Sequence, residues 1–518
     1  MAEFLKDIDH IVVLMFENRS FDSILGWLYD PENLPPYDKV PAGQSFEGVS
    51  GKGLTNKDSG GSPIPVGDTR DTTNPFPDPG EEYQNVYMQM YGGAFIPEAG
   101  DVPIDPGPHP PMSGFIQNYE RQKDPNGGNV GLPSAHNVMN GFRPTDLPVF
   151  AKLAHEFVVC DHWFASVPSQ TLTNRSFVHA GTASGYVNNT FVNSTRTIFN
   201  VLGRYGKSWR IYHGGHDFLC NARATQRKLT KYACWDPHRR FRPIAELAED
   251  AKHGRLPHYA FIEPNFMASE EYGPENDMHP DHGLVDIGDA SDCKNGDQYL
   301  ARVYMALRNG KNWDKTLLIV TFDEHGGCYD HVPPPYQDPN FPPPDNRHVR
   351  KGHKAYSGFR FDRLGVRVPT LLISPRLPAR TVINSNFDHT SILRTVVDKF
   401  NLPKDRLGKR VEVAPRIDPP LVPMRTDTPV FDVVTPPPAT GEQLDRGLST
   451  HHEWMLDVAQ QAHGRTFKVA PTTLRDLQEQ WNTERRSPWA WLKHAVVCIL
   501  STIAVLVEEI VGFLQRHL

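Results

Sequence analysis

The feature that most constrains the fold of this chain is a series of short apolar runs that recur through most of its length. They lie at 10–16, 156–164, 208–213, 259–263, 316–322 and 368–374. Runs of this length with few polar residues are typical of strands that are buried on both faces. Strands of this kind indicate a sheet that is covered by helices on each side.

Helical patterns follow several of these runs. Apolar residues that return every three or four positions mark one face of a helix, and they do so in 21–28, 300–307 and 392–397. We therefore predict an α/β fold with a largely parallel central sheet sandwiched by helices, followed by a C-terminal helical extension. In such sheets ligands bind beyond the carboxyl ends of the strands.

Proline marks the end of the main domain. The chain has 518 residues, enough for one large domain with accessory segments. Prolines recur from about 416 to 440, a composition typical of an extended, semi-rigid connector. We predict a main domain over 1–415, a proline-rich linker over 416–440 and a helical region over 441–518 that ends in an apolar amphipathic helix.

Charge and cysteine content exclude several classes of protein. The formal net charge is -7 and no basic block is present, so nucleic acid is not an expected partner. The six cysteines form no CxxC pair that would indicate a zinc ribbon. The first ten residues, MAEFLKDIDH, contain no signal peptide pattern. We expect synthesis in the cytoplasm, with export by another route or peripheral binding to a membrane.

Polar residues gather where three apolar runs end. Glu17 and Asn18 follow the first run, Asp323 and Glu324 follow the fifth, and hydroxyl residues lie in 166–181. Carboxylate and amide oxygens suit a divalent cation, and a threonine hydroxyl could complete its shell. The alternative is that these acids cap helices or pair with arginine. The adjacent pair after 316–322 favours the metal, because a buried edge would otherwise leave two charges uncompensated.

Five motifs in order then identify a family. They are ENRSFD at 17–22, DLPVFAKLAHEFVVCDHWFASVPSQTLTNR at 146–175, NDMHPDH at 276–282, TFDEHGG at 321–327 with YDHVPPP behind it, and DHTSILR at 388–394. With these motifs the chain resembles the phosphoesterase family of bacterial phosphatidylcholine-hydrolysing phospholipases C, plant non-specific phospholipases C and some bacterial acid phosphatases. The resemblance implies an alkaline-phosphatase-like core.

The resemblance also implies a metal site and a nucleophile. Glu17, Asn18, Asp323 and Glu324 would hold one divalent ion, and Thr171 would be both a ligand and the attacking residue. Thr171 lies three residues before the asparagine of the family's P-N-R segment, although here threonine 173 stands where proline is usual. Thr173 and Ser169 are therefore rival candidates for the nucleophile.

Four of the 23 histidines occupy motif positions that the resemblance places around the phosphate. His279 and His325 are expected to be catalytic, carrying protons to the leaving group and from water. His109 and His331 are expected to bind phosphate oxygens.

Three further residues are expected to support the site. His389 follows a strand-like run and precedes a helix, so it would orient a metal ligand or cap that helix. Arg19 and Arg175 are expected to hold the scaffold by pairing with carboxylates, without touching substrate.

The identity of the metal stays open. Oxygen-rich ligands admit calcium, magnesium or manganese, and the resemblance makes zinc equally arguable. We expect zinc or calcium, with magnesium or manganese as alternatives. Coordination would lower the pKa of the attacking hydroxyl, and a phosphothreonine intermediate would follow.

The C-terminal segment helps to indicate the class of substrate. Residues 495–507 form a run without charged side chains. This run is shorter than the ~20 residues that a helix needs to span a bilayer. As a helix, 494–516 would carry a narrow polar stripe, with Trp489 and Trp491 at one end as interfacial anchors. It would dock on a membrane surface, or equally on its own domain or a second copy of the chain.

Three functions are therefore weighed. An anchor would serve a phospholipase C that releases diacylglycerol and a phosphorylated head group, with phosphatidylcholine as the expected substrate among a range of phospholipids. A metal-dependent acid phosphatase would use the same residues, and a non-catalytic membrane-associating protein would keep only the fold. The intact set of predicted site residues favours an enzyme.

Overall fold

The computed structural model describes 3–92, 109–123, 127–132, 134–189, 193–216, 220–230, 232, 236, 238–280, 292–336, 359, 361–445 and 471–484, and four isolated positions beyond them, 503, 506, 507 and 510.

Within these residues, an eight-stranded sheet crosses the centre of the molecule in the order β13-β6-β12-β11-β1-β10-β8-β9. Its strands are β1 (His10–Phe16), β6 (Val158–Cys160), β8 (Trp209–His213), β9 (Phe241–Pro243), β10 (Tyr259–Glu263), β11 (Thr316–Phe322), β12 (Leu371–Ile373) and β13 (Thr381–Ile383). All neighbours are parallel except β12, which is antiparallel to both β11 and β6. The predicted, largely parallel sheet is confirmed.

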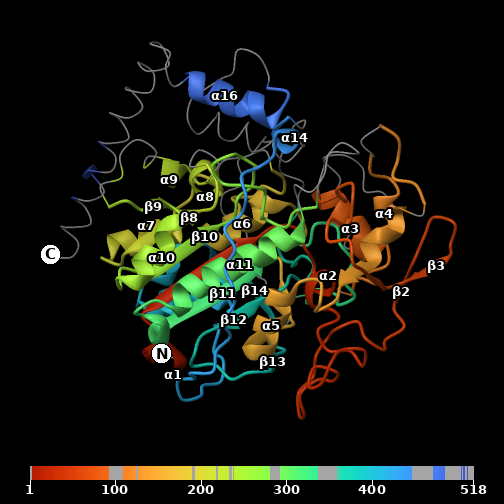
Figure 1. Ribbon diagram of the computed structural model, residues 1–518, viewed down its shortest axis with the longest axis horizontal. Helices are drawn as coiled ribbons and strands as arrows, with labels where there is room; N and C mark the ends of the chain where they lie inside the picture. The colour runs from red at the N-terminus through yellow and green to blue at the C-terminus, as the bar shows by residue number, and fades with distance from the viewer. Residues whose placement is uncertain are drawn as a thin grey trace.

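Helices cover both faces of this sheet (Figure 1). On one face, Phe150 of α5 (Pro148–Glu156) and Tyr299 of α11 (Cys293–Arg308) contact the ring of Phe16. On the other, His179 of α6 (Thr171–Ala180) contacts Phe261, which pairs in register with Val13. Since side chains alternate along a strand, positions 13 and 16 of β1 point to opposite faces. Two helical layers therefore enclose the sheet.

The remaining elements complete these layers or form the long loops. They are α1 (Glu3–Lys6), α2 (Phe21–Leu25), β2 (Thr55–Lys57), β3 (Pro63–Pro65), β4 (Gly67–Thr69), α3 (Tyr83–Tyr91), α4 (Phe115–Tyr119), η1 (Ser134–Met139), β5 (Asn140–Phe142), β7 (Trp163–Phe164), α7 (Ile198–Arg204), α8 (Asn221–Thr225), α9 (Arg227–Thr230), α10 (Ala245–Lys252), η4 (Trp313–Lys315), β14 (Phe387–Asp388), α12 (His389–Lys399), η5 (Lys404–Arg406) and α13 (Lys409–Val413). The loop-rich stretch after α2 holds β2 to β5, α3 and α4, which lie to one side of the sheet (Figure 1).

The segment predicted as a linker, 416–440, runs extended along the surface of the main domain. Tyr304 of α11 donates its hydroxyl to the carbonyl of Pro429 at 3.0 Å, and the Phe431 ring lies 5.7 Å from the Tyr304 ring. Arg425 forms an ion pair with Glu156 at 3.0 Å. We call this segment the strap, because these contacts hold it to the two helices of one face.

The strap leads to α14 (Gly441–Leu444) and α16 (Leu474–Glu484), at the top of Figure 1. Leu444, Leu474 and Leu477 pack against 266–268, the loop that follows β10. Gln478 donates to the carbonyl of Ala268 at 3.0 Å. The described part of the C-terminal region is thus joined to a loop that leaves the carboxyl end of the sheet.

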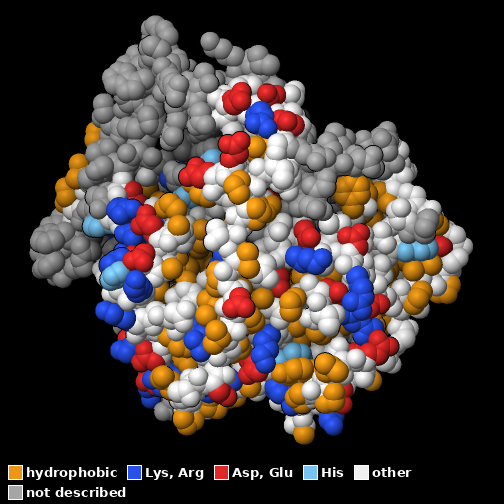
Figure 2. Space-filling view, in the orientation of Figure 1, with side chains coloured by type: hydrophobic (Ala, Val, Ile, Leu, Met, Phe, Trp, Pro, Cys, Tyr) orange, Lys and Arg blue, Asp and Glu red, His pale blue; other side chains and the backbone are white. Residues whose placement is uncertain are grey.

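Most of the predicted apolar helix lies outside the described residues. The exceptions are Ile503, Leu506, Val507 and Ile510, which are helical and are 45% to 57% exposed. No described helix is long and apolar enough to cross a membrane. On the face seen in Figure 2, acidic and basic side chains are interspersed.

Candidate metal centre

Carboxylates from three neighbouring strands point to one side of the sheet. Phe16 and Phe322 are partners in register, so Glu17 and Asp323 leave β1 and β11 side by side. Glu263 ends β10, the neighbour of β1 on the other side. The alternation of side chains directs all three toward α6. Each is fully buried, so the sheet itself concentrates negative charge at this edge.

Arg175 of α6 lies among these carboxylates. Its Nη2 is 3.0 Å from Glu17 Oε1 and its Nε is 2.9 Å from Asp323 Oδ2. The guanidinium is fully buried and supplies one positive charge. These contacts confirm the prediction that Arg175 pairs with carboxylates.

Thr171 begins the same helix, one turn before Arg175. Its hydroxyl donates to Asn18 Oδ1 at 3.3 Å, and the backbone N–H of Asn18 donates to Asp323 Oδ1 at 3.2 Å. Asn18 has φ 61, a left-handed conformation that asparagine tolerates better than most residues. This turn brings Asn18 into contact with both the predicted nucleophile and Asp323.

Glu324 completes the predicted ligand set. Its backbone N–H donates to Asp323 Oδ1 at 2.8 Å, and its Oε2 accepts from the backbone N–H of Gly326 at 2.8 Å. Its Oε1 is buried and has no hydrogen-bond partner among the described residues. Gly326 lies so close to Asn18 that a Cβ on it would be 2.1 Å from the Asn18 carbonyl oxygen.

The electrostatics of the cluster fit a cation. Burial raises the pKa of Glu17 well above its usual value, and the charge of Asp323 adds to the rise that Arg175 opposes. Burial raises the pKa of Glu324 in the same way, and the Asp323 charge raises it further. One guanidinium does not balance three or more carboxylates. A divalent ion would favour their ionised forms, and the oxygen donors present suit it.

The structure adds two acidic residues that the sequence argument missed, Asp78 and Glu81. The Asn18 amide nitrogen donates to Glu81 Oε1. His279 Nε2 is 3.3 Å from that same oxygen, and His279 Nδ1 is 3.9 Å from Asp78 Oδ1. Burial and then the charge of Glu324 raise the pKa of Glu81. Both acids lie in a proline-rich loop, and the only signal for them was the acidic run DPGEE at 78–82.

The predicted catalytic histidines have different surroundings. His279 lies beside Glu81 and Asp78, as described. His325 is fully buried, and its Nε2 is bonded to Gln89 Oε1 at 2.8 Å while its Nδ1 is 3.2 Å from Glu324 Oε2. Burial lowers the pKa of His325 to about 3, so it is neutral at ordinary pH. Catalytic roles for the two residues stay predictions.

The predicted phosphate-binding histidines lie apart from these contacts. His331 Nδ1 is bonded to Asp22 Oδ2 at 2.7 Å, and its Nε2 is 2.8 Å from Lys52 Nζ. Arg367 pairs with Asp22 at 2.8 Å. His109 is exposed, and no described contact joins it to the buried carboxylates. Phosphate binding by His331 and His109 stays a prediction.

His389 supports a predicted ligand from behind. Its Nε2 donates to the carbonyl of Asp323 at 2.6 Å, and its Nδ1 accepts from Trp163 Nε1 at 3.3 Å. Burial lowers the pKa of His389, in keeping with a neutral ring that bridges donor and acceptor. Arg19 was expected to pair with a carboxylate, but it donates instead to the backbone carbonyls of Met278 at 2.7 Å and of Asn74. It therefore ties two loops to the centre through their backbones.

The rival nucleophiles differ from Thr171 in their contacts. Ser169 donates its hydroxyl to the carbonyl of Val187. The Thr173 hydroxyl is buried with no hydrogen-bond partner among the described residues. Of the three, Thr171 is the one bonded to Asn18, which favours it as the attacking residue.

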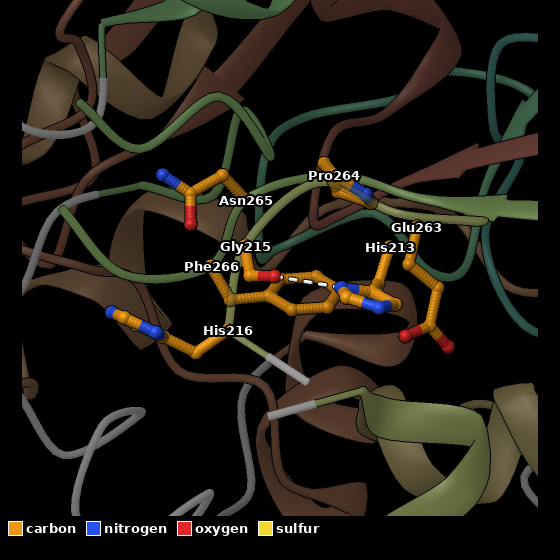
Figure 3. Close-up of a pocket in the computed structure, with 7 residues that line it drawn as sticks. All are labelled: His213, Gly215, His216, Glu263, Pro264, Asn265 and Phe266. Atoms are coloured by element: carbon orange, nitrogen blue, oxygen red, sulfur yellow. Dashed lines mark hydrogen bonds between the residues drawn. The ribbon is translucent and has the colours of Figure 1, made fainter. Parts of the chain in front are cut away.

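A small hollow lies beside this centre, next to Glu263 (Figure 3). In it, His213 donates from Nδ1 to the carbonyl of Gly215 at 2.7 Å. Phe266 lines the hollow and its ring centroid is 5.4 Å from the Arg175 guanidinium. The lining residues are His213, Gly215, His216, Glu263, Pro264, Asn265 and Phe266. Of the buried carboxylates, Glu263 is the one that lines this hollow.

The fold and this cluster define an α/β protein with a buried, oxygen-rich centre at the carboxyl edge of a parallel sheet, with a hydroxyl at a helix start beside it. The chain belongs to the phosphoesterase family, whose model matches residues 8–403. It is 37% identical over 465 residues to a protein named non-specific phospholipase C3 of Arabidopsis thaliana, with 87% of this chain and 80% of that protein covered. It is 29% identical over 455 residues to phospholipase C B of Mycobacterium tuberculosis, with 78% and 75% covered.

Solved structures also match part of the chain. One is described as a protein in the alkaline phosphatase superfamily from Vibrio parahaemolyticus, with TM-score 0.29, 13% identity, and 49% of this chain and 60% of that chain covered. Another is the lipoteichoic acid synthase LtaP of Listeria monocytogenes, with TM-score 0.31, 13% identity, and 66% and 87% covered.

Proposed function

We propose that the chain is a phospholipase C that hydrolyses glycerophospholipids, with phosphatidylcholine first among them, to diacylglycerol and a phosphorylated head group. Relatives named phospholipase C over most of its length support a phosphoric diester hydrolase. The observation that carries the proposal is the Thr171 hydroxyl bonded to Asn18, beside the carboxylates that Arg175 holds.

The residues of the chain divide the chemistry between them. Thr171 Oγ1 would lose its proton and attack phosphorus, and the diacylglycerol oxygen would leave and take up a proton. A water would then lose a proton and cleave the phosphothreonine, which restores the Thr171 hydroxyl, with His279 and His325 as the proposed proton carriers. Glu17, Asn18, Asp323 and Glu324 would hold a divalent cation, which supplies charge stabilisation and lowers the pKa of a bound hydroxyl. The position of Thr171 at the start of α6, with its hydroxyl bonded to Asn18, supports this role.

We propose zinc or calcium as the cation, with magnesium and manganese as alternatives. The donor atoms are carboxylate and amide oxygens, and all four ions coordinate oxygens of this kind. Elemental analysis of the purified protein, with phospholipid turnover measured before and after chelation, identifies the ion. Turnover that persists after complete removal of metal would contradict a metal-dependent route.

We also propose that the C-terminal segment brings the enzyme to a membrane. The exposed apolar positions 503, 506, 507 and 510 follow the i, i+3, i+4, i+7 spacing of one helix face. Sedimentation with phosphatidylcholine vesicles, compared for the parent and a Leu506→Asp variant, tests this. Association of copies of the chain without vesicle binding would favour an oligomer contact instead.

The test of the function compares two substrates and three variants. We expect turnover of a phosphatidylcholine diester to exceed that of an aryl phosphate monoester. Thr171→Ala should reduce turnover on the order of 10³-fold or more, and Thr171→Ser should retain part of it. Thr173→Ala is the matched control on the same helix and should stay active.

Each other outcome points to a different function. Preference for the monoester would indicate a metal-dependent acid phosphatase with the same residues. Activity in Thr171→Ala equal to the parent would remove Thr171 as the nucleophile. No turnover of either ester by the metal-loaded protein would favour a non-catalytic, membrane-associating role.

A further inference from the structure

A second group of metal-ligating side chains adjoins the predicted centre. Asp78, Glu81 and His279 each offer a ligand atom, and these atoms lie within 4.8 Å of one another. Their side chains are 9%, 9% and 5% exposed, whereas those of Glu17 and Glu324 are 0% exposed. The group therefore lies nearer to solvent than the buried carboxylates.

The ring of His279 turns its Nε2 toward this group. Its Nδ1 is 2.6 Å from the carbonyl of Pro280, so Nδ1 donates to that carbonyl and Nε2 is the nitrogen left to face the acids. Nε2 in turn is 3.3 Å from the carboxylate oxygen Glu81 Oε1. A proton or a cation between Nε2 and this oxygen would stabilise the contact. A ring that donates from one nitrogen to a backbone carbonyl is also the usual arrangement of a metal-bound histidine.

The charges of the group differ from those of a structural cluster. Asp22, Asp330 and His331 form a similar group, but Arg367 pairs with both acids at 2.8 Å. The described partners of Glu81 are the Asn18 amide, the His279 ring and Asp78, none of them an arginine or lysine, while the Arg19 charge acts on Asp78. Glu324 Oε1, which is buried and has no hydrogen-bond partner among the described residues, adds a further acidic oxygen to this part of the molecule.

The loop that carries Asp78 and Glu81 is fixed in place. Gln89 donates to the carbonyl of Gly80 at 2.7 Å, and Tyr119 donates to the carbonyl of Pro77. Arg19 donates to Asn74 at the start of the loop. Ligands on a loop held at three points are preorganised, which favours binding of an ion.

We propose that Asp78, Glu81 and His279 bind a second divalent cation beside the one assigned to Glu17, Asn18, Asp323 and Glu324. Two carboxylates and an imidazole suit zinc or manganese better than calcium. Asn18 would connect the two sites, since its Oδ1 accepts from Thr171 and its Nδ2 donates to Glu81. The assignment makes His279 a ligand in place of the proton carrier that the sequence predicts.

The test counts metal equivalents. The full-length protein is stripped of metal, equilibrated with Mn²⁺ or Zn²⁺, and analysed by elemental analysis and calorimetric titration. We expect two equivalents for the parent and one for Glu81→Gln and Asp78→Asn. Glu82→Gln, a change at the exposed neighbour, is the matched control and should keep two. Thermal unfolding of the stripped variants shows whether each is folded.

Electron paramagnetic resonance of the Mn²⁺-loaded protein gives an independent readout. Two neighbouring Mn²⁺ ions should couple, and the coupled signal should vanish in Glu81→Gln. One equivalent in the parent and in Glu81→Gln would overturn the second site and leave the group holding a proton. One equivalent in the parent and none in Glu81→Gln would also overturn it, by making Glu81 a ligand of a single ion. Two equivalents without phospholipid turnover would refute the proposed function and leave this site standing.

Discussion

At the scale of single residues, Arg175 is the positive charge on which the buried carboxylates of the metal-free protein depend. Arg175→Met removes the partner of both Glu17 and Asp323, and breaking a buried ion pair in this way costs about 3–5 kcal/mol. We expect that loss in denaturant unfolding of the metal-free protein, and a smaller loss with divalent metal present. Arg475→Met, which breaks an exposed pair with Asp445, is the control and should change stability by less than about 1 kcal/mol. Equal stability of parent and Arg175→Met would refute this reading.

Gly326 is the second residue on which the centre depends. Gly326→Ala would place a Cβ 2.1 Å from the carbonyl oxygen of Asn18, at a residue with φ +60. The clash must displace the turn that carries Asn18, so we expect a loss of roughly 2 kcal/mol or more in stability and weaker metal binding. Gly43→Ala has a similar φ of +77 and open space around it, so it isolates the cost of the backbone angle alone, about 1 kcal/mol. Calorimetric metal titration and chemical denaturation measure both effects, and identical results for the two variants would contradict the clash.

Residue patterns predicted part of the candidate centre and missed the rest for a physical reason. Glu17 and Asp323 follow strands that are adjacent and in register, so their position after apolar runs was enough to bring them together. Asp78 and Glu81 lie in a loop whose path depends on contacts with Gln89 and Arg19. Periodic sequence patterns do not encode the path of such a loop, so they did not predict that these two acids lie at the centre.

At the scale of secondary structure, α5 and α11 are coupled through a buried carboxylate. Asp297 of α11 accepts from the backbone N–H groups of Val149 and Phe150 at 3.1 and 2.8 Å, in the first turn of α5. Burial raises the pKa of Asp297 from 3.8 to about 7. The folded state thus holds its proton more tightly than the unfolded state does.

The upward shift of the Asp297 pKa determines how the stability of the fold depends on pH. A raised folded-state pKa gives stability that is fully present below about pH 4 and is lost as the pH rises through about 7. In Asp297→Asn this contribution disappears, so the free energy of unfolding should fall less between pH 4 and 7 than in the parent. Denaturant unfolding across this range measures it, with the exposed Asp405→Asn as control. Parallel curves for parent and Asp297→Asn would contradict the shift.

The order of elements along the chain was easier to predict than their direction. Every apolar run named from the sequence contains a strand, and the helices near 21, 300 and 392 are present. The run at 156–164 divides into β6 and β7, because Asp161 and His162 interrupt it with a turn. The antiparallel direction of β12 depends on the path of the long connection after β11, and local sequence patterns do not predict that path.

At the scale of the whole molecule, the strap makes the C-terminal part continuous with the main domain. Phe431 is partly buried against the core, and its ring packs on Tyr304. Phe431→Ala should cost about 1–3 kcal/mol and increase protease cleavage within 416–440, since the segment would detach more readily. Val433→Ala changes an exposed neighbour and is the control. Cleavage of 416–440 at the same rate in the parent and in Phe431→Ala would show that the segment is not held by this contact.

Trp163 donates its indole N–H to His389, and His389 donates to the backbone carbonyl of Asp323. Two hydrogen bonds therefore link the indole to a predicted metal ligand. An indole whose N–H is bonded to a side chain next to the ligands reports changes there in its ultraviolet emission, so the molecule contains its own optical probe. The chain has nine tryptophans, and the difference spectrum between the parent and Trp163→Phe isolates this one. Loading of the centre could then be followed in real time, without a dye and without turnover.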